Sequence, residues 1–315
     1  MKALVTGGAG FIGSTMVDRL LADGHEVVAI DNLVTGKPEN LEAARTNYAN
    51  AFTFVEHDIR DESTQKVVAD LQAEVVIHLA AQMDVRVSVA DPLYDASVNI
   101  TGALNVLEGT RQAGSRKILF ASSGGTIYGV ADHALLPFDE QTPQLPISPY
   151  AISKKAFTDY LFGYQQMYGL EYATLALGNV FGPRQDPHGE AGVVAIFGQR
   201  LLAGEQCKIY GDGNATRDYV YVDDVVDAFA RSADKGDGLF NVGTGVETSP
   251  NQLYDILAKE AGVDTPPEYA PARTGELDRV ALNASRLTEV TGWKPQTDLE
   301  TGLRNVLDFI RNQRA

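Results

Sequence analysis

Tyr150 and Lys154 are two side chains whose types and spacing could move a proton. They stand four residues apart just after Ser148-Pro149, a pair typical of a helix start, so both are expected on one helix face. A free tyrosine has a pKa of about 10, and a neighbouring ammonium is expected to lower that value by stabilising the phenolate. The pattern therefore predicts a tyrosine base for a hydroxyl proton, although an isolated pair of this kind is also common on a solvated helix.

A glycine-rich loop near the N-terminus is the second feature that points to chemistry. Apolar residues 2–6 predict a buried strand, residues 7–13 read Gly-Gly-Ala-Gly-Phe-Ile-Gly, and the apolar spacing over 14–23 predicts a helix. A second apolar run, 26–30, ends at an acid, Asp31. This order of strand, glycine loop, helix, strand and acid indicates a dinucleotide-binding unit, in which the backbone approaches a pyrophosphate at the helix N-terminus.

The acid at the end of this unit indicates which dinucleotide would bind. Asp31 would accept hydrogen bonds from the adenosine ribose hydroxyls and repel a 2′-phosphate, which favours NAD over NADP, unless it is only a solvated turn residue. Asp58 and Ile59 follow the apolar run 52–55 and could contact the adenine, although Asp58 could equally begin the next helix. A positively charged nicotinamide beside Tyr150 would lower the pKa of its phenol further.

Strand and helix signals alternate through the first half of the chain. This alternation predicts the α/β class, with a Rossmann-type doubly wound parallel sheet. Ligands on such sheets bind at the carboxyl ends of the strands, so the residues just after each strand are candidates for the site. His78 ends an apolar run and is interpreted as a core residue, whereas the small Ala80 and Ala81 after it fit a wall against the cofactor.

A turn-rich stretch over 182–189 indicates a domain boundary near residue 178. We therefore expect an NAD-binding domain over 1–178 and a smaller α/β substrate-binding domain over 179–315. Within the second domain, residues 221–232 are expected to be helical and could pack back on the first domain.

Composition narrows the classes of partner. Of the 315 residues, 44% are hydrophobic and 22% are charged, as in a soluble globular protein, and the formal net charge of −16 argues against nucleic acid or an anionic membrane surface. The single cysteine, Cys207, allows neither an intrachain disulfide nor a metal cluster, so we expect no metal and a reducing, cytoplasmic location. The first strand begins at residue 2 and no apolar run reaches transmembrane length, so neither a signal peptide nor a membrane span is expected.

Motifs along essentially the whole chain resemble those of the extended short-chain dehydrogenase/reductase family, and most closely those of its UDP-hexose 4-epimerases. They are TGGAGFIG (6–13), DN (31–32), HDIRDE (57–62), HLAAQ (78–82), NITG (99–102), SSGGTIYG (122–129), SPYAISK (148–154), GNVFGPRQDP (178–187), TRDYVYVDDV (216–225), NVGTG (241–245) and RTGE (273–276). The resemblance implies an enzyme that epimerises UDP-glucose and UDP-galactose at C4 through a transient 4-keto sugar, with NAD as cofactor.

The resemblance and the glycine-loop pattern together imply a set of site residues. Tyr150, Lys154 and Ser123 would be catalytic. The cofactor would be contacted by Gly7, Gly10, Phe11, Ile12, Gly13, Asp31, Asn32, Asp58, Ile59, Leu79, Ala80, Ala81, Asn99, Tyr150 and Lys154. The substrate would be contacted by Ser123, Tyr150, Asn179, Val193, Tyr210, Arg217, Arg273 and Glu276, with Asn179 and the two arginines at the diphosphate and Tyr210 near the uracil.

One position departs from the best-known epimerase pattern. Where many relatives carry the catalytic serine or threonine, this chain has Gly124, and residues 123–126 instead resemble a Thr-Gly-Gly-Ala motif with serine in first place. The substrate-hydroxyl partner is therefore expected to be Ser123, with Ser122 and Thr126 as alternatives. Related dehydratases and decarboxylases carry an acid in this segment, and its absence argues against elimination or decarboxylation.

Other readings of the same residues stay open. By resemblance, substrate breadth depends on the pocket near Val280, where a bulky aromatic in relatives blocks an N-acetyl group, so a UDP-N-acetylhexosamine or a UDP-uronate is an alternative substrate. A non-catalytic NAD-binding regulator is a further alternative, against which the intact Tyr150 and Lys154 argue. The resemblance also implies a homodimer through the helices near 94–113 and 149–168, although these helices could equally be buried within one chain.

Overall fold

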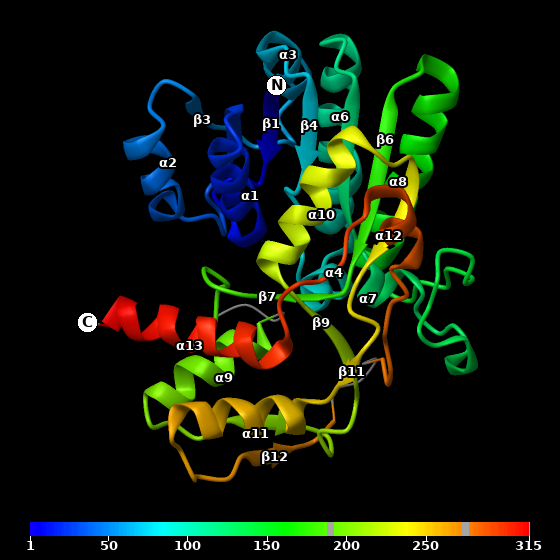
Figure 1. Cartoon of the computed structure of the whole chain (residues 1–315). Helices are drawn as coiled ribbons and strands as arrows, with labels where there is room; N and C mark the ends of the chain where they lie inside the picture. The colour runs from blue at the N-terminus through cyan, green and yellow to red at the C-terminus, as the bar shows by residue number, and fades with distance from the viewer. Residues whose placement is uncertain (188–191, 273–276, 315) are drawn as a thin grey trace.

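A parallel sheet of seven strands forms the centre of the protein (Figure 1). The structure is a computed structural model that describes residues 1–187, 192–272 and 277–314. Across the sheet the order is β10-β6-β5-β4-β1-β2-β3. The strands are β1 (Lys2–Thr6), β2 (Glu26–Asp31), β3 (Phe52–Glu56), β4 (Val75–His78), β5 (Lys117–Ser123), β6 (Glu171–Leu177) and β10 (Gly238–Val242).

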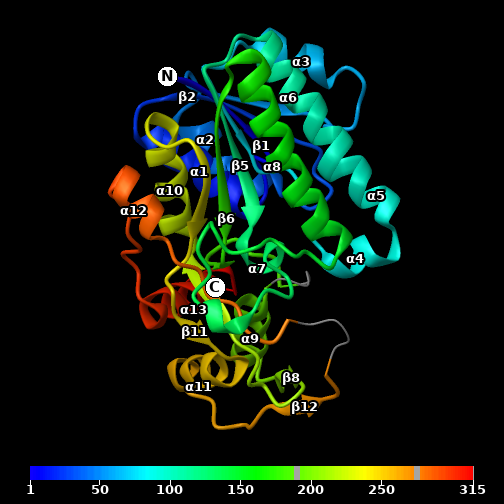
Figure 2. The same ribbon diagram turned by 90° about the vertical axis from the view of Figure 1, so that its right-hand side faces the viewer.

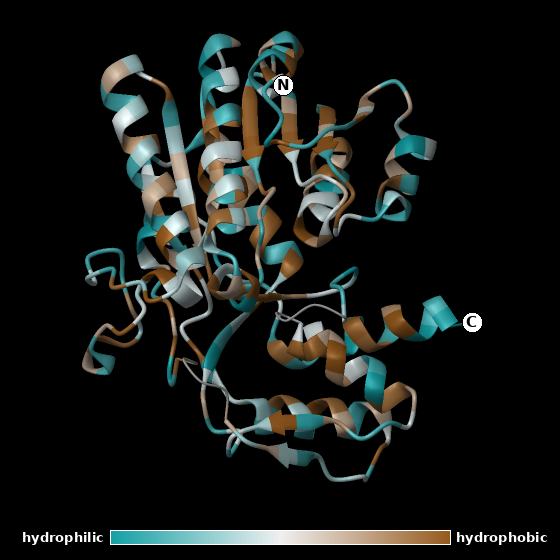
Figure 3. Cartoon of the chain, turned by 180° about the vertical axis from the view of Figure 1, so that it is seen from behind, coloured by the Kyte–Doolittle hydropathy of each residue, from teal (hydrophilic) through white to brown (hydrophobic). Residues whose placement is uncertain are grey.

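Helices cover both faces of this sheet, which is why its strands are continuous apolar runs (Figure 2). Neighbouring residues of one strand enter different cores: Val5 packs with α1, α2, α10 and α12, whereas Leu4 packs with α3, α6 and α8. These helices are α1 (Phe11–Ala22), α2 (Glu42–Asn47), α3 (Thr64–Leu71), α6 (Ala103–Gln112), α8 (Pro149–Tyr168), α10 (Val222–Asp234) and α12 (Ser285–Thr291). Seen from behind, strands at the centre of the sheet are drawn largely in brown, the colour of hydrophobic residues (Figure 3).

The connection from β4 to β5 is one long helical segment, as the sequence predicts for residues 94–113. It consists of α5 (Pro92–Ala96), a π-helical turn η2 (Ser97–Gly102) and α6, and it is preceded by α4 (Val85–Ala90). Helices α4, α5 and α8 pack side by side (Figure 2). A π-helical turn inside an α-helix is frequently found at a functional site.

A smaller lobe lies below the sheet in Figure 1. Its apolar core joins three helices to two short sheets, in the orders β11-β9-β7 and β12-β8. The elements are β7 (Asn179–Phe181), α9 (Val193–Leu202), β8 (Lys208–Tyr210), β9 (Arg217–Tyr221), β11 (Glu247–Thr248), α11 (Pro250–Ala261), β12 (Glu268–Ala270) and α13 (Leu299–Arg314). The short connecting helices are η1 (Pro38–Leu41), α7 (Gly124–Ile127) and η3 (His133–Leu135).

The large sheet contains strands from both sides of the domain boundary that was expected near residue 178. Strand β10 pairs in parallel with β6 as the edge of the sheet, and α10 packs on α1. The chain therefore returns to the first half after β9, as was expected for residues 221–232. The predicted division into domains 1–178 and 179–315 does not include this return of β10.

Candidate active site

The carboxyl ends of β1 and β4 place the glycine loop against the segment that follows β4. A Cβ atom added at Gly7 would lie 2.7 Å from the amide nitrogen of Ala80, so the two backbones touch. The predicted cofactor residues Leu79, Ala80 and Ala81 follow β4 directly and are all partly exposed. The structure thus brings these two candidate cofactor segments together at one edge of the sheet.

The glycine loop is suited to approach by a dinucleotide pyrophosphate. Gly7 has a φ of +70°, and a Cβ added at Gly13 would lie 1.9 Å from the carbonyl oxygen of Gly7. Among the described residues no side chain caps the N-terminus of α1, whose first residues are Phe11 and Ile12. The amide groups of that first turn can therefore serve an anion, so the residues present fit NAD.

Asp31 ends β2 with its carboxylate fixed beside the glycine loop. Its Oδ2 accepts a 3.0 Å hydrogen bond from the Ala9 amide, and its Oδ1 accepts one of 2.8 Å from the Leu33 amide. Gly36 leaves room for this carboxylate, because a Cβ there would lie 2.7 Å from Oδ1. Asp31 is therefore a rigidly held acceptor, as ribose recognition requires.

Asp58, predicted to contact the adenine, is bound by two neighbouring side chains. Arg60 donates to Asp58 through its Nε and Nη2 atoms, and Asn32 donates through its Nδ2 at 2.9 Å. These bonds, led by Arg60, hold the pKa of the Asp58 carboxyl well below its usual range. Ile59 is buried in the core beside Gly102. At the predicted adenine site Asp58 thus supplies a charged group, and the buried Ile59 supplies an apolar one.

Tyr150 and Lys154 lie in the first turns of α8, where the sequence predicts them. Ser148 caps this helix by accepting a hydrogen bond from the Ala151 amide at 3.2 Å. The Lys154 Nζ donates a 3.0 Å hydrogen bond to the carbonyl oxygen of Ala121 in β5, and it lies 5.7 Å from the centre of the Tyr150 ring. The helix therefore carries the pair to the carboxyl end of β5.

Burial shifts the pKa values of both members of this pair. Burial raises the pKa of Tyr150 to about 12, although a hydrogen bond with Ser123 acts in the opposite direction. Burial also lowers the pKa of Lys154 to about 8. The predicted lowering of the Tyr150 pKa invoked the lysine together with a positively charged nicotinamide, so it stays a prediction for the NAD-loaded protein. In the protein by itself desolvation is the largest influence on both groups.

Ser123 is the hydroxyl that reaches Tyr150. The Ser122 hydroxyl is buried without a hydrogen-bond partner among the described residues, and the Thr126 hydroxyl donates to the Ser123 carbonyl at 3.4 Å. A side chain at Gly124 would clash, since its Cβ would lie 2.5 Å from Leu282 and 2.9 Å from a backbone oxygen. The geometry therefore supports Ser123 over both alternatives.

Gly125, which has no side chain, lies next to Asn179 of the smaller lobe. A Cβ added there would lie 3.3 Å from the Asn179 Oδ1 and 4.0 Å from the Ser123 Oγ. Asn179 begins β7, which pairs in parallel with β9, so that Asn179 is opposite Tyr219. Arg217 begins β9 and its Nη1 donates to the Thr216 carbonyl at 2.8 Å. This register brings Asn179 and Arg217 to the same small sheet.

The remaining substrate candidates are spread more widely. Val193 begins α9 and is partly buried against the lobe's core, and Tyr210 ends β8 with 41% of its surface exposed. Val280 is only 2% exposed and packs with Ile127, Tyr128 and other apolar side chains. Arg273 and Glu276 lie outside the described residues.

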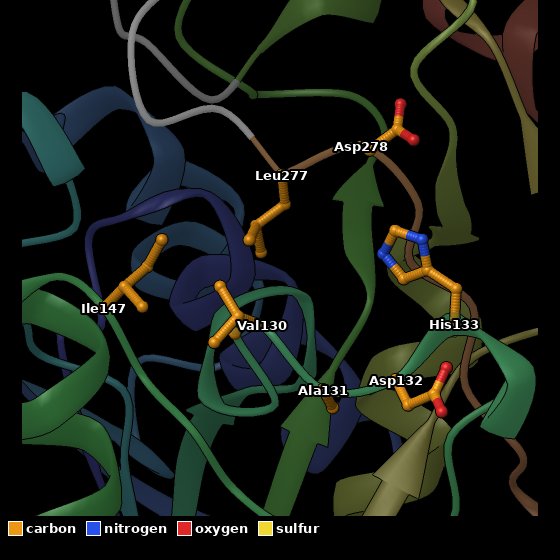
Figure 4. Close-up of a pocket in the computed structure, with 8 residues that line it drawn as sticks. Val130, Ala131, Asp132, His133, Ile147, Leu277 and Asp278 are labelled. Carbon is orange, nitrogen blue, oxygen red and sulfur yellow. The ribbon is translucent and has the colours of Figure 1, made fainter.

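A pocket of about 440 Å³ opens close to the end of α7 (Figure 4). Val130, Ile147 and Leu277 come to it from three separate segments of the chain. His133 and Asp278 add polar groups to its wall. The residues that line this pocket do not include Ser123, Tyr150 or Lys154.

The sequence analysis did not identify Asp95, a buried carboxylate that contacts the helix turn carrying Tyr150 and Lys154. Asp95 accepts hydrogen bonds from Ser153 and from Asn99, which was predicted to contact the cofactor. The four-residue spacing of Asp95 and Asn99 in a helical segment was the signal that could have found it. His78, interpreted as a core residue, is buried between Phe120 and Phe157, and burial lowers its pKa to about 3.

Neither a metal-binding cluster nor a membrane-spanning helix is found in the described ranges, 1–187, 192–272 and 277–314. No group of three or more histidine, cysteine or acidic residues there could hold a metal ion. In the same part of the chain no helix combines the length and the apolar character that crossing a membrane demands.

The fold and this site together define a Rossmann-type, dinucleotide-binding enzyme of the extended short-chain dehydrogenase/reductase class. Residues 3–243 match the model of the NAD dependent epimerase/dehydratase family, and the chain belongs to that family. The resemblance found in the motifs and the predicted fold class are thereby confirmed.

The chain is similar over almost its whole length to several UDP-glucose 4-epimerases. The UDP-glucose 4-epimerase of Mycolicibacterium smegmatis is 50% identical over 99% of both chains. A crystal structure of UDP-glucose 4-epimerase with UDP-glucose from Thermotoga maritima has 44% identity and a TM-score of 0.95, covering 100% of both chains. The crystal structure of the Thermus thermophilus UDP-glucose 4-epimerase in complex with NAD has 45% identity and a TM-score of 0.91, covering 99% of both chains.

Proposed function

We propose that this protein is an NAD-dependent 4-epimerase that interconverts UDP-glucose and UDP-galactose through a transient 4-keto sugar. The observation that carries the proposal is the meeting of Ser123, Tyr150 and Lys154 at the carboxyl end of β5. The glycine loop lies on the same edge of the sheet, as a cofactor facing these groups requires. The similarity to UDP-glucose 4-epimerases over the whole chain supports the choice of substrate.

Each polar group at this site has a distinct part in the reaction. NAD, when bound, supplies a hydride carrier that is regenerated within each turnover. Tyr150 takes the proton of the C4 hydroxyl and later returns it, while Ser123 hydrogen-bonds the same oxygen. Lys154 stabilises the phenolate. Because burial raises the pKa of Tyr150 to about 12, its phenolate needs further stabilisation, which the positive charge of a bound nicotinamide would supply.

The bound diphosphate is proposed to hold the substrate while the sugar ring turns from one face to the other. Asn179 lies beside Gly125 and Ser123, which places its amide next to the reacting end of the site. Arg217, on the strand that pairs with that of Asn179, is proposed to bind the diphosphate, as is Arg273. A tether of this kind lets the 4-keto sugar rotate and accept hydrogen on its other face.

The segment 123–126 supports epimerisation over elimination. Residues 123–126 are Ser-Gly-Gly-Thr, so this segment has no carboxylate that could act as the base and remove a proton from the neighbouring carbon. The role of Asp31, held by two backbone amides, supports NAD rather than NADP.

We further infer a homodimer through α4, α5 and α8. Large apolar side chains are exposed along these packed helices, and they are Val87, Val89, Leu93, Ile152, Tyr160, Phe162, Met167 and Tyr168. Exposed apolar surface of this extent usually marks an interface. The buried free Cys207 supports a reducing, cytoplasmic location, where the proposed reaction would serve galactose metabolism.

The test is to incubate the purified protein, without added cofactor, with UDP-glucose, UDP-N-acetylglucosamine or UDP-glucuronate in separate reactions. Chromatography that resolves each epimer should show UDP-galactose formed from UDP-glucose. Product from either of the other two sugars alone would assign the alternative substrate. Absence of product from all three, with NAD bound, would favour a non-catalytic regulator and contradict the proposal.

A further inference from the structure

A buried carboxylate touches the helix turn that carries the proposed catalytic pair. Asp95 in α5 is 0% exposed, and its Oδ2 accepts a 2.7 Å hydrogen bond from the Ser153 hydroxyl. Its Oδ1 accepts from the Asn99 Nδ2 at 2.9 Å and from the Gln82 Nε2 at 3.0 Å. Ser153 precedes Lys154 directly, so Asp95 is tied to the catalytic turn of α8 by one hydrogen bond.

The same carboxylate joins three elements that surround the site. Asn99 in η2 donates through its Nδ2 to the Gln82 carbonyl at 2.8 Å, and its Oδ1 accepts from the Gln82 amide at 2.9 Å. The segment after β4, the π-helical turn and α8 therefore converge on Asp95. A buried network whose members are all paired is rigid, because breaking any bond leaves a polar group unsatisfied.

Charge gives Asp95 a second effect on this site. Lys154 is 4% exposed, and burying an ammonium is costly unless an opposite charge lies near. Among the described residues Asp95 is the charged group that opposes this cost: it raises the pKa of Lys154, although burial, the larger effect, lowers it to about 8. Asp95 also raises the pKa of Tyr150. From β4, His78 faces Lys154 and stays neutral above its pKa of about 3.

We propose that Asp95 is a positioning residue for the reaction at Tyr150, holding the catalytic turn of α8 against the segment after β4 and supplying the negative charge that keeps Lys154 an ammonium. The inference deepens the proposed 4-epimerase function and rests on it. An ammonium stabilises a neighbouring phenolate, whereas a neutral amine does not. Because three donors point at the Asp95 oxygens, a carboxylate satisfies them all, while an amide would turn its own NH₂ group toward one of them.

The first test follows the ionisation of Tyr150 and needs no turnover. The tyrosinate absorbance of the NAD-loaded protein is measured as a function of pH for the wild type and for Asp95→Asn. The contribution of Tyr150 is isolated by subtracting the absorbance of the same protein with Tyr150→Phe added. At the alkaline pH of this titration Lys154, whose pKa is about 8, is already neutral, so the direct repulsion between Asp95 and the phenolate remains. Loss of Asp95 should therefore move the ionisation of Tyr150 to lower pH. Superimposable titrations would overturn the proposed electrostatic role, whether or not the protein proves to be an epimerase.

The second test uses the pH profile of kcat with UDP-galactose. Without Asp95 the pKa of Lys154 falls, so Asp95→Asn should lose activity on the alkaline side at a lower pH than the wild type. Asp95→Glu keeps the charge and should restore the wild-type alkaline midpoint. A loss of kcat at all pH values without any shift would reduce Asp95 to a structural residue and overturn the charge argument.

Ser153→Ala is the matched control for these variants. It removes the 2.7 Å hydrogen bond to Asp95 and leaves the carboxylate in place, so it should lower kcat without moving the alkaline midpoint. Thermal unfolding of every variant shows whether the fold persists. A midpoint that moves equally in Ser153→Ala and Asp95→Asn would contradict the proposal, because only the second variant removes a charge.

Discussion

The Lys154 ammonium lies 5.7 Å from the centre of the Tyr150 ring and is held there by a 3.0 Å hydrogen bond to the Ala121 carbonyl. This bond ties the lysine to β5, whose last residue, Ser123, hydrogen-bonds the phenol. The tyrosine is thus placed by its own helix and by the strand beside it. Its chemistry depends on that placement, because burial by itself makes the phenol a poorer acid.

Replacing Tyr150 with phenylalanine should remove the proton acceptor while keeping the ring. We expect epimerisation to fall by about 100- to 10,000-fold, the range of general acid–base catalysis. Bound NAD, measured by its release on denaturation, should be retained because the glycine loop is untouched. Epimerisation at the wild-type rate would contradict the role of Tyr150.

Replacing Gly13 with alanine should abolish retention of NAD. The new Cβ would lie 1.9 Å from the Gly7 carbonyl oxygen and 3.0 Å from the Gly8 Cα, so the loop has to move. Gly163→Ala in α8 is the control, since its Cβ would meet only the Met167 side chain, at 4.0 Å. Calorimetric titration with NAD measures both variants, and equal affinities would refute the predicted contact of the loop with the pyrophosphate.

Replacing Arg217 with glutamine should weaken substrate binding without affecting NAD. Loss of a charge-assisted bond to the diphosphate predicts a decrease of about 10- to 100-fold in kcat/KM. Arg304→Gln, which loses a pair with Glu260 in the smaller lobe, is the control and should keep the wild-type value. If both variants keep that value, Arg217 does not bind the diphosphate.

Because His78 is buried in its neutral form, we expect the free energy of unfolding to decrease in acid. Its pKa in the folded protein is about 3, below the ordinary histidine value of about 6.5, so the unfolded chain binds one more proton between these values. Stability from this residue is complete above pH 6.5 and falls as the pH decreases toward 3. Between pH 7 and pH 5 the free energy of unfolding should drop by about 2 kcal/mol more in the wild type than in His78→Phe. Urea unfolding at the two pH values measures this, and equal drops would show that His78 is not held neutral.

Replacing Leu93 with aspartate should break the inferred dimer. Leu93 is 82% exposed on α5, and a charge there could not be buried between two copies of the chain without a partner. Val290→Asp, on α12 away from the inferred interface, is the control. Sedimentation should give a dimer for the wild type and the control and a monomer for Leu93→Asp. A monomeric wild type would contradict the inferred homodimer.

Much of the fold and part of the site were predictable from local patterns. The run before the glycine loop, the helix start at Ser148-Pro149 and the acid at Asp31 each depend on neighbours in sequence, and the structure shows the strand, helix and strand end there. The choice of Ser123 over Ser122 and Thr126 was a prediction that the geometry now supports.

Other features depended on contacts between distant segments. The return of β10 to the edge of the sheet is set by its pairing with β6, whose partner residues lie 65 positions earlier in the chain, and no local pattern encodes such a pairing. The burial that raises the pKa of Tyr150 could not be predicted from the sequence, because desolvation depends on everything packed around a side chain.

The sequence by itself determined the order of strands and helices, the glycine loop and the presence of a tyrosine and a lysine on one helix face. Those properties arise from the period of apolar residues and from the backbone freedom of glycine, which act over a few residues. Only the tertiary structure decided how deeply Lys154 is buried and that the Asp95 carboxylate bonds to Ser153, the residue before it. Burial and charge act through space, so they become defined only when α5, β5 and α8 have packed together.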